Sequence, residues 1–331
     1  MPRPPKVICN KAVLLVTTSL EEGLLFPPNP LINLILGSCL ARAQTLHPVK
    51  VCHHLFEPNH GHLILAVENP DDVPDFMERF KTESANAINR LLGRRKRTVW
   101  CEGYDSPPIL TISSVISKIV YIYTNPSKDG LENTIHQYPG LSSWEAFNKP
   151  LKTTETYPRV RRFHVPCITK DENISTLKLA NKLIKKIKTR HKFTVNPDAW
   201  MDAFQIYEDS ERQAINAEIK EKVIKEEQSH RETRKQNRTS VIGRQKLISS
   251  PMNLDYVSLK KGKRMICISD DKELRKNTIN DIRARQEEGR EVIERWKLGD
   301  FRLQYPIGLF PPSFPKRCEA YSSSGFALGE D

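Results

Sequence analysis

The sequence has no run approaching the ~20 consecutive apolar residues of a membrane span, and residues 1–6 lead into a mixed segment rather than the apolar region of a signal peptide. These absences predict a cytoplasmic protein without membrane contact. The seven cysteines are odd in number and widely spaced, with no CxxC pair, which argues against a zinc cluster and favours reduced thiols. A glycine-rich phosphate-binding loop is also absent, so no nucleotide cofactor is expected.

Positive charge is present in excess, and it is unevenly distributed. The chain has 331 residues, a hydrophobic content of 38% and a formal net charge of +12. Residues 1–150 hold 15 basic and 14 acidic side chains, whereas residues 151–331 hold 37 and 26. A basic excess favours binding to a polyanion such as nucleic acid, because each neutralised phosphate releases a counterion. Charge alone fits a solvated surface equally well.

The first half reads as alternating strands and helices. Period-two and helical apolar spacings predict strands at 11–19, 49–56, 62–67 and 100–104, and helices at 30–45, 71–91 and 113–125. Asp71 or Asp72 is expected to cap the second helix, and Pro126 to end the third. This order predicts an α+β fold of the ferredoxin-like sort, with an antiparallel sheet sandwiched by helices.

After residue 150 the composition becomes lysine-rich and largely helical. Helices are expected at 177–192, 207–238 and 270–296, with a short strand-like piece at 265–269. The proline- and serine-rich end reads as an extended tail. We therefore predict three parts, namely an α+β domain over 1–150, a basic and mostly helical extension over 151–305 that is expected to bind DNA, and an extended or disordered tail over 306–331.

The string NHGHLIL, residues 59–65, is the most informative motif. Side chains at i and i+2 of a strand point to the same face, so His60 and His62 would present two imidazoles side by side. Two imidazoles on one strand form a large part of a metal site. Taken alone, the pair also fits two polar residues on an exposed strand face.

The helix predicted at 113–125 carries Tyr121 and Asn125 at spacing i, i+4, so both lie on one helix face. Ile112, Ile116, Ile119 and Tyr123 would pack against the sheet on the other side, which leaves Tyr121 facing a cleft. A lone tyrosine there also fits a core or surface aromatic residue.

Four separated motifs together resemble those of the REP-associated tyrosine transposases, which are single-tyrosine HUH endonucleases. They are NHGHLIL at 59–65, VW at 99–100, KIVYIYTNPSKDGL at 118–131 and YPGLSSW at 138–144. They occur in the family's order and spacing, and the resemblance covers residues 10–147. It implies the HUH endonuclease fold for this half of the chain.

Carried over residue by residue, the resemblance makes Tyr121 the nucleophile, and His60, His62 and Asn125 the ligands of one Mg²⁺ or Mn²⁺. Two imidazoles and one amide oxygen suit Mn²⁺ better on softness grounds, while cellular abundance favours Mg²⁺. The sequence departs from the His-hydrophobic-His pattern at Gly61, which loosens the strand but leaves both imidazoles in place.

The resemblance also implies an activity and its surroundings. It implies cleavage of single-stranded DNA beside a hairpin through a 5′-phosphotyrosine intermediate, followed by strand transfer. It further implies a monomer acting at repeated palindromes in a bacterial nucleoid.

Further DNA contacts are expected in basic segments, through phosphates rather than bases. The candidates are Arg94, Arg95, Lys96, Arg97, Lys185, Lys186, Lys261, Lys263 and Arg264, with Trp100 as a base-stacking residue. A solvated turn and a core aromatic are the alternatives for the segment 94–100. His54 could support the metal site or simply lie in the core.

Rival readings remain open at the level of sequence. One is a DNA-binding descendant that has lost catalysis, with Gly61 as a sign of decay. Another is a metal-dependent hydrolase that uses water in place of Tyr121. Relaxases and replication initiators rank lower, because the sequence shows neither a third histidine at a fitting place nor a phosphate-binding glycine loop.

Overall fold

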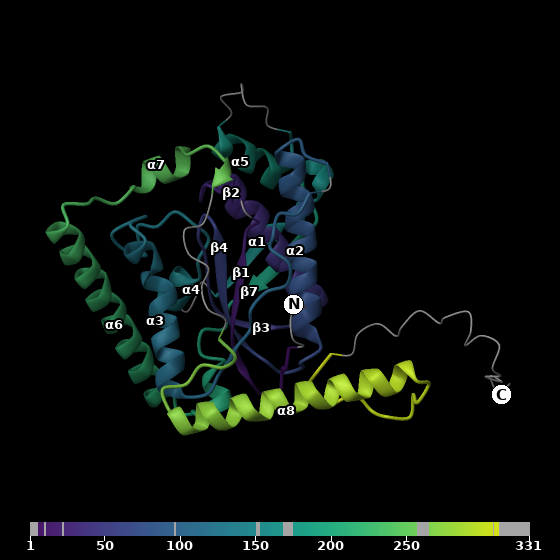
Figure 1. Ribbon diagram of the computed structural model, residues 1–331. Coiled ribbons are helices and arrows are strands. Elements are labelled where there is room, and N and C mark those ends of the chain that lie inside the picture. The colour runs from purple at the N-terminus through teal and green to yellow at the C-terminus, as the bar shows by residue number, and fades with distance from the viewer. Residues whose placement is uncertain are drawn as a thin grey trace. The chain divides into compact units, whose positions relative to one another are not determined.

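The computed structural model describes residues 6–9, 11–21, 23–95, 97–149, 153–167, 175–256, 265–306 and 308–310 (Figure 1). Contacts divide the chain into two compact units, Asn10–Lys276 and a smaller one made of Met1–Cys9 and Asn277–Asp331. These units do not coincide with the predicted parts 1–150, 151–305 and 306–331, so that functional division stays a prediction. Most of the predicted tail lies outside the described residues.

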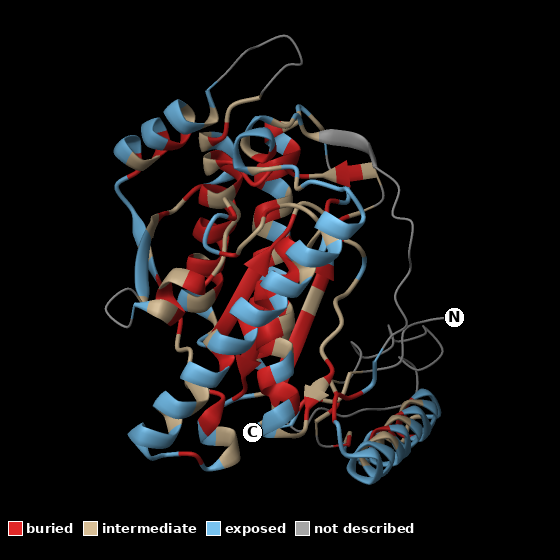
Figure 2. Cartoon of the chain, turned by 90° about the vertical axis from the view of Figure 1, so that its left-hand side faces the viewer, coloured by how far each residue is buried: buried red, intermediate tan, exposed pale blue. Residues whose placement is uncertain are grey.

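A four-stranded antiparallel sheet forms the centre of the larger unit. Its strands are β1 (Val13–Ser19), β3 (Lys50–Phe56), β4 (His60–Ala66) and β5 (Pro108–Ile109), in the order β3-β4-β1-β5. The register of β1 on β4 places Thr17 opposite His62. The strands are buried almost throughout (Figure 2), which explains their nearly continuous apolar sequences.

Helices cover both faces of this sheet, as the sequence predicts. On one side lie α1 (Pro30–Leu46) and α2 (Asp72–Leu91), and on the other side lies α3 (Ile112–Lys128) (Figure 1). Leu15 and Ile64 belong to one buried cluster with Ile119 and Tyr123 of α3. Because side chains alternate along a strand, His62 lies on the same face as Ile64 and points toward α3. The α+β fold class is confirmed.

The remaining elements of the larger unit pair or pack around this core. β2 (Gly23–Leu25) pairs with β8 (Asn253–Tyr256), and β6 (Thr154–Pro158) pairs with β7 (Arg190–Thr194). The other helices are α4 (Trp144–Asn148), η2 (Arg162–His164), α5 (Thr176–Lys186), η3 (Met201–Phe204), α6 (Asp209–Gln236) and α7 (Arg244–Ser249).

Several element predictions were wrong in detail. Residues 100–104 form no strand, because Trp100 makes only a single bridge to Leu20 and its ring is buried against Phe80. The strand forms instead at Pro108–Ile109. Pro126 lies inside α3, which continues to Lys128, since a proline near a helix end removes only one hydrogen bond.

The boundaries of other predicted elements also shift. The lysine-rich helix ends at Lys186, because Arg190–Thr194 pairs as β7 with β6. Residues 265–269 form a single bridge, Ile109 with Ile268, rather than a strand. Asp71 occupies the N-cap position of α2 without a capping hydrogen bond from its side chain, so the predicted cap is absent.

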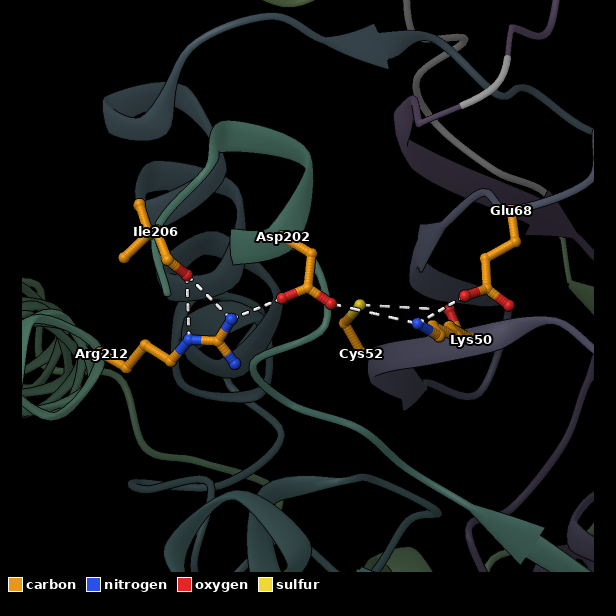
Figure 3. A network of polar contacts seen from close by, with 6 residues as sticks. All are labelled: Lys50, Cys52, Glu68, Asp202, Ile206 and Arg212. Atoms are coloured by element: carbon orange, nitrogen blue, oxygen red, sulfur yellow. Dashed lines mark hydrogen bonds and ion pairs between the residues drawn. The ribbon is translucent and has the colours of Figure 1, made fainter. Parts of the chain in front are cut away.

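The segment after residue 150 contributes to the core of the larger unit. Trp200 and Met201 are fully buried in the cluster that contains Tyr123, and Ile219 and Val223 of α6 join it from outside α3. A polar network on the surface connects the same parts, with Lys50 Nζ 2.6 Å from Glu68 and 4.0 Å from Asp202 (Figure 3). Arg212 binds Asp202 at 2.5 Å, so β3 and α6 are linked by packing and by charge.

The smaller unit contains most of α8 (Lys272–Lys297) and a short segment near the N-terminus. The Trp296 and Tyr305 rings pack in a tilted arrangement with centroids 5.5 Å apart, and the Trp296 indole donates to the Leu303 carbonyl at 3.0 Å. In the described part of the chain no helix combines the length and apolarity needed to cross a membrane.

Candidate active site

The paired histidines lie at the start of β4 and face α3. The ring centroids of His60 and His62 are 4.6 Å apart, with the planes at 86°. His62 is 4% exposed, so the pair is not the exposed strand feature that the motif alone allowed. The register of β4 between β1 and β3 fixes both imidazoles on a buried strand.

Hydrogen bonds at the Nδ1 atoms orient both rings. His60 Nδ1 lies 2.6 Å from the Asn59 Oδ1 acceptor, and His62 Nδ1 lies 2.9 Å from Thr17 Oγ1. An amide oxygen only accepts, so His60 carries its proton on Nδ1 and its Nε2 has a free lone pair. If His62 likewise donates from Nδ1, both Nε2 atoms are ready to bind a metal ion.

Burial keeps both imidazoles neutral. Desolvation lowers the pKa of His60 from its ordinary value, and desolvation followed by the neighbouring His60 lowers the pKa of His62 well below it. A neutral imidazole is the form that binds a metal ion. His62 Nε2 is buried and has no hydrogen-bond partner within the described residues, which is costly unless a ligand satisfies it.

Tyr121 comes to the same place from α3. The helix begins at Ile112 and is capped by the Thr111 side chain. Its buried residues, among them Ile119 and Tyr123, pack against the sheet. The Tyr121 and His62 ring centroids are 5.6 Å apart in an edge arrangement. The ammonium groups of Lys118 and Lys128 lie 5.3 and 5.1 Å from the Tyr121 ring centroid. The structure therefore brings the tyrosine, the histidines and two cations together.

Asn125 follows one turn after Tyr121 and is 2% exposed. The described residues contain no group of three or more histidine, cysteine, aspartate or glutamate side chains placed to hold a metal ion. A metal ion at His60 and His62 would therefore need an amide or a substrate oxygen, and Asn125 offers the amide. The orphaned Nε2 and the neutral imidazoles fit such an ion, while the ligand set itself stays a prediction.

Sequence reasoning missed Glu57, which lies three residues before His60. The Glu57 N–H donates to the His60 carbonyl at 2.8 Å, which closes the turn and brings a carboxyl oxygen to 3.3 Å from His60 Nε2. Desolvation, and then Asp129, raise the pKa of Glu57 to about 8. The signal that could have revealed Glu57 is the four-residue turn 57–60, which brings its first residue back to the first histidine of the motif.

Lys118 and Lys128 were also missed. Both lie on the helical stripe that carries Tyr121 and Asn125, so their spacing was visible in the sequence. Desolvation, and then the charge of Lys128, lower the pKa of Lys118.

The glycine in the histidine motif has a packing cause. A Cβ atom on Gly61 would lie 2.5 Å from Cδ1 and Cε1 of Phe56, the residue opposite it on β3. Phe56 thus fills the volume that a hydrophobic side chain would occupy in the motif. β4 runs without interruption from His60 to Ala66, and the loosening of the strand by Gly61 stays a prediction.

The other proposed DNA contacts have different outcomes. Trp100 cannot stack on bases, because it is 6% exposed and its indole donates to Ser84 Oγ at 2.8 Å. The remaining basic candidates stay predictions. Arg95, Arg97, Lys185 and Lys186 are exposed and Arg94 is half-buried, while Lys96, Lys261, Lys263 and Arg264 lie outside the described residues.

The two histidines before the motif belong to the core. His53 Nδ1 lies 2.8 Å from the Tyr123 hydroxyl. His54 packs against Phe193, with ring centroids 5.4 Å apart, and burial lowers its pKa to about 3. The core alternative for His54 is therefore the correct one.

Comparisons with known proteins find similarity to transposases. Residues 31–125 match the family model described as "Transposase IS200 like", a range that contains His60, His62, Tyr121 and Asn125. A solved structure of a REP-associated tyrosine transposase bound to a REP hairpin is 16% identical to this chain. The match has a TM-score of 0.39 and covers 53% of this chain and 96% of the other. No curated protein sequence matches the chain.

Proposed function

We propose that this chain cleaves single-stranded DNA beside a hairpin and holds the cut end on Tyr121, in line with the match of residues 31–125 to the family model "Transposase IS200 like". The observation that carries the proposal is the contact between Tyr121 and His62, whose ring centroids are 5.6 Å apart although they come from α3 and β4. The proposed nucleophile and one candidate metal ligand therefore lie in contact, which supports the proposal.

The chain's own residues prepare the site for a divalent cation. His60 and His62 would hold Mg²⁺ or Mn²⁺ through Nε2, with Asn125 as the third protein ligand. When bound, the ion supplies positive charge that offsets the charge developing on the scissile phosphate. Asn59 and Thr17 orient the two imidazoles through their Nδ1 atoms, and burial keeps them unprotonated.

Tyr121 performs the covalent step. Its Oη attacks phosphorus, forming an oxygen–phosphorus bond, and the bond from phosphorus to the 3′-oxygen breaks. The phenol proton leaves to solvent, and the departing 3′-oxygen takes up a proton to become a hydroxyl. The 5′-phosphotyrosine keeps the energy of the diester, so a later 3′-hydroxyl can attack it and transfer the strand.

Lys118 and Lys128 position the phosphate in front of Tyr121. Their ammonium groups lie about equally far from its ring, at 5.3 and 5.1 Å, and attract an anionic substrate to that place. The target strand is expected to be unpaired, since a duplex would shield the phosphate.

The test is formation of a denaturant-resistant protein–DNA adduct. The full chain is incubated with hairpin-bearing single strands and Mn²⁺, and we expect an adduct that disappears in Tyr121→Phe. Tyr207→Phe is the matched control, because Tyr207 is 64% exposed and lies outside the site. A chelator should abolish the adduct in the wild-type chain.

The same assay separates the rival functions. Cleavage that persists in Tyr121→Phe without any adduct would establish a hydrolase that uses water. DNA binding without an adduct under any divalent metal would establish a binding protein that has lost catalysis. Gly61 gives no support to the second rival, because Phe56 explains the glycine by packing.

A further inference from the structure

A cavity of about 410 Å³ opens beside the candidate active site. Its walls come from the loop after β2, the turn between β3 and β4, the end of α3 and the segment around α7. They are mostly apolar, with Phe26, Pro27 and Ile242 among them. The volume lies in the range of small-molecule sites, about 300–1,000 Å³.

Acceptor groups stand at one side of this cavity. Glu57, Asn59 and Asp129 line it, whereas none of the lysine and arginine residues that the structure describes does. Glu57 is 7% exposed, and neither carboxyl oxygen has a hydrogen-bond partner within the described residues. Its 3.3 Å approach to His60 Nε2 does not meet hydrogen-bond geometry. A buried carboxyl group without a partner indicates a ligand that donates hydrogen bonds.

The cavity adjoins the place where the phosphate is expected. Asp129 directly follows Lys128, whose ammonium lies over the Tyr121 ring. Asn59 connects the candidate active site with the cavity, because its Oδ1 accepts from His60 Nδ1 and the residue also lines the cavity. A nucleotide with its phosphate at Tyr121 therefore has a neighbouring base within reach of the cavity.

We propose that this cavity binds one unpaired nucleobase that carries an exocyclic amino group, next to the cleaved phosphate. The inference rests on the proposed function and adds a sequence preference to it. Apolar walls suit the faces of a base, and the carboxyl groups accept from its amino group. The Asp129 carboxylate repels a phosphate. Thymine fits poorly, because it has no exocyclic amino group to donate to these oxygens and its carbonyl oxygens would face Asp129.

Part of the cavity wall comes from the segment after residue 150. Ile242 and Leu247 come from the extension, and the backbone of Ile242 donates to the Gly130 carbonyl at 2.8 Å. The extension thus supplies one wall of the base site, and the other walls come from residues 25–28, 57–59 and 129–131.

The experiment is a binding selection with the full chain carrying Tyr121→Phe, so that no cleavage occurs. The probe is a DNA hairpin with a randomised single-stranded flank, and the bound molecules are sequenced. We expect thymine to be depleted about ten-fold at one flank position. Ile242→Trp, which fills the cavity, should abolish this preference. Ile224→Trp is the matched control, because Ile224 is 63% exposed on α6 and does not line the cavity.

Two results would overturn the proposal: no flank position depleted of thymine, or a depletion that Ile242→Trp leaves unchanged. If Ile242→Trp shows no cooperative unfolding, the test uses Asp129→Asn instead, a substitution at an exposed residue. The amide that it introduces can donate a hydrogen bond, so it should weaken the discrimination against thymine. The adduct assay on the selected DNA reports separately on the proposed function. A base preference without an adduct supports the cavity and contradicts cleavage, whereas an adduct without any preference does the reverse.

Discussion

The packing of Phe56 against Gly61 makes a strong prediction for the histidine motif. Replacing Gly61 with valine would restore a hydrophobic residue between the histidines. Its Cβ atom would start 2.5 Å from two ring carbons of Phe56, ~0.9 Å short of the 3.4 Å at which ordinary contact begins. Phe56 also packs on Phe80, with ring centroids 5.5 Å apart, so it cannot move freely. We expect the free energy of unfolding to fall by about 1–3 kcal/mol.

The assay is urea unfolding of a double-mutant cycle. Phe56→Ala alone should cost about 3–5 kcal/mol by leaving a cavity. In the double variant the valine occupies part of that cavity, so the two losses should sum to more than the measured loss, with a coupling of at least about 1 kcal/mol. Losses that add within about 0.5 kcal/mol, or a Gly61→Val chain as stable as the wild type, would refute the packing explanation.

Three further predictions concern the support of the site. Burial lowers the pKa of His54 to about 3, so the wild type loses stability as the pH falls below the ordinary value of 6.5, where the unfolded chain binds a proton and the folded chain does not. The free energy of unfolding of His54→Phe should therefore rise by about 2 kcal/mol relative to that of the wild type between pH 7.5 and pH 5, as measured by urea unfolding. A difference that does not depend on pH would contradict this. Arg234 of α6 donates to the Ser127 carbonyl in the last turn of α3, so Arg234→Ala should lower stability by about 1–2 kcal/mol and slow adduct formation, whereas exposed Arg231→Ala should change neither. A fragment of residues 1–150 should show no cooperative unfolding by circular dichroism, because it lacks buried residues that pack on α3; a transition as sharp as that of the full chain would disprove it.

The sequence predicted the elements whose apolar spacing is regular. β1, β4, α1 and α3 appear close to their expected places, because each buries a stripe or face that is visible in its own residues. Pairing between distant segments was not visible. Thr154–Pro158 is a strand only because Arg190–Thr194 lies beside it, and neither has the apolar alternation of a half-buried strand. The sequence left base stacking and a core position open for Trp100, because its partner Ser84 lies on a separate helix.

The candidate site was predicted in part for the same reason. His60, His62 and Tyr121 could be placed on faces by strand and helix periods, and the structure brings them together. Glu57 escaped notice because its position depends on a turn folding back, and a carboxylate before a proline reads as an ordinary loop residue. The need for glycine at position 61 could not be predicted either, since it depends on the register of β3 with β4.

The basic extension has a structural role in addition to its charge. Trp200 and Met201 are fully buried in the cluster that holds Tyr123, two residues from the proposed nucleophile. Ile219 and Val223 cover α3 from the side away from the sheet. The proposed cleavage site and the basic extension therefore cannot be separated simply by dividing the chain at residue 150. A substitution that detaches α6 would release the helix that presents Tyr121 to His62, so loss of DNA affinity and loss of cleavage should accompany each other in such a variant.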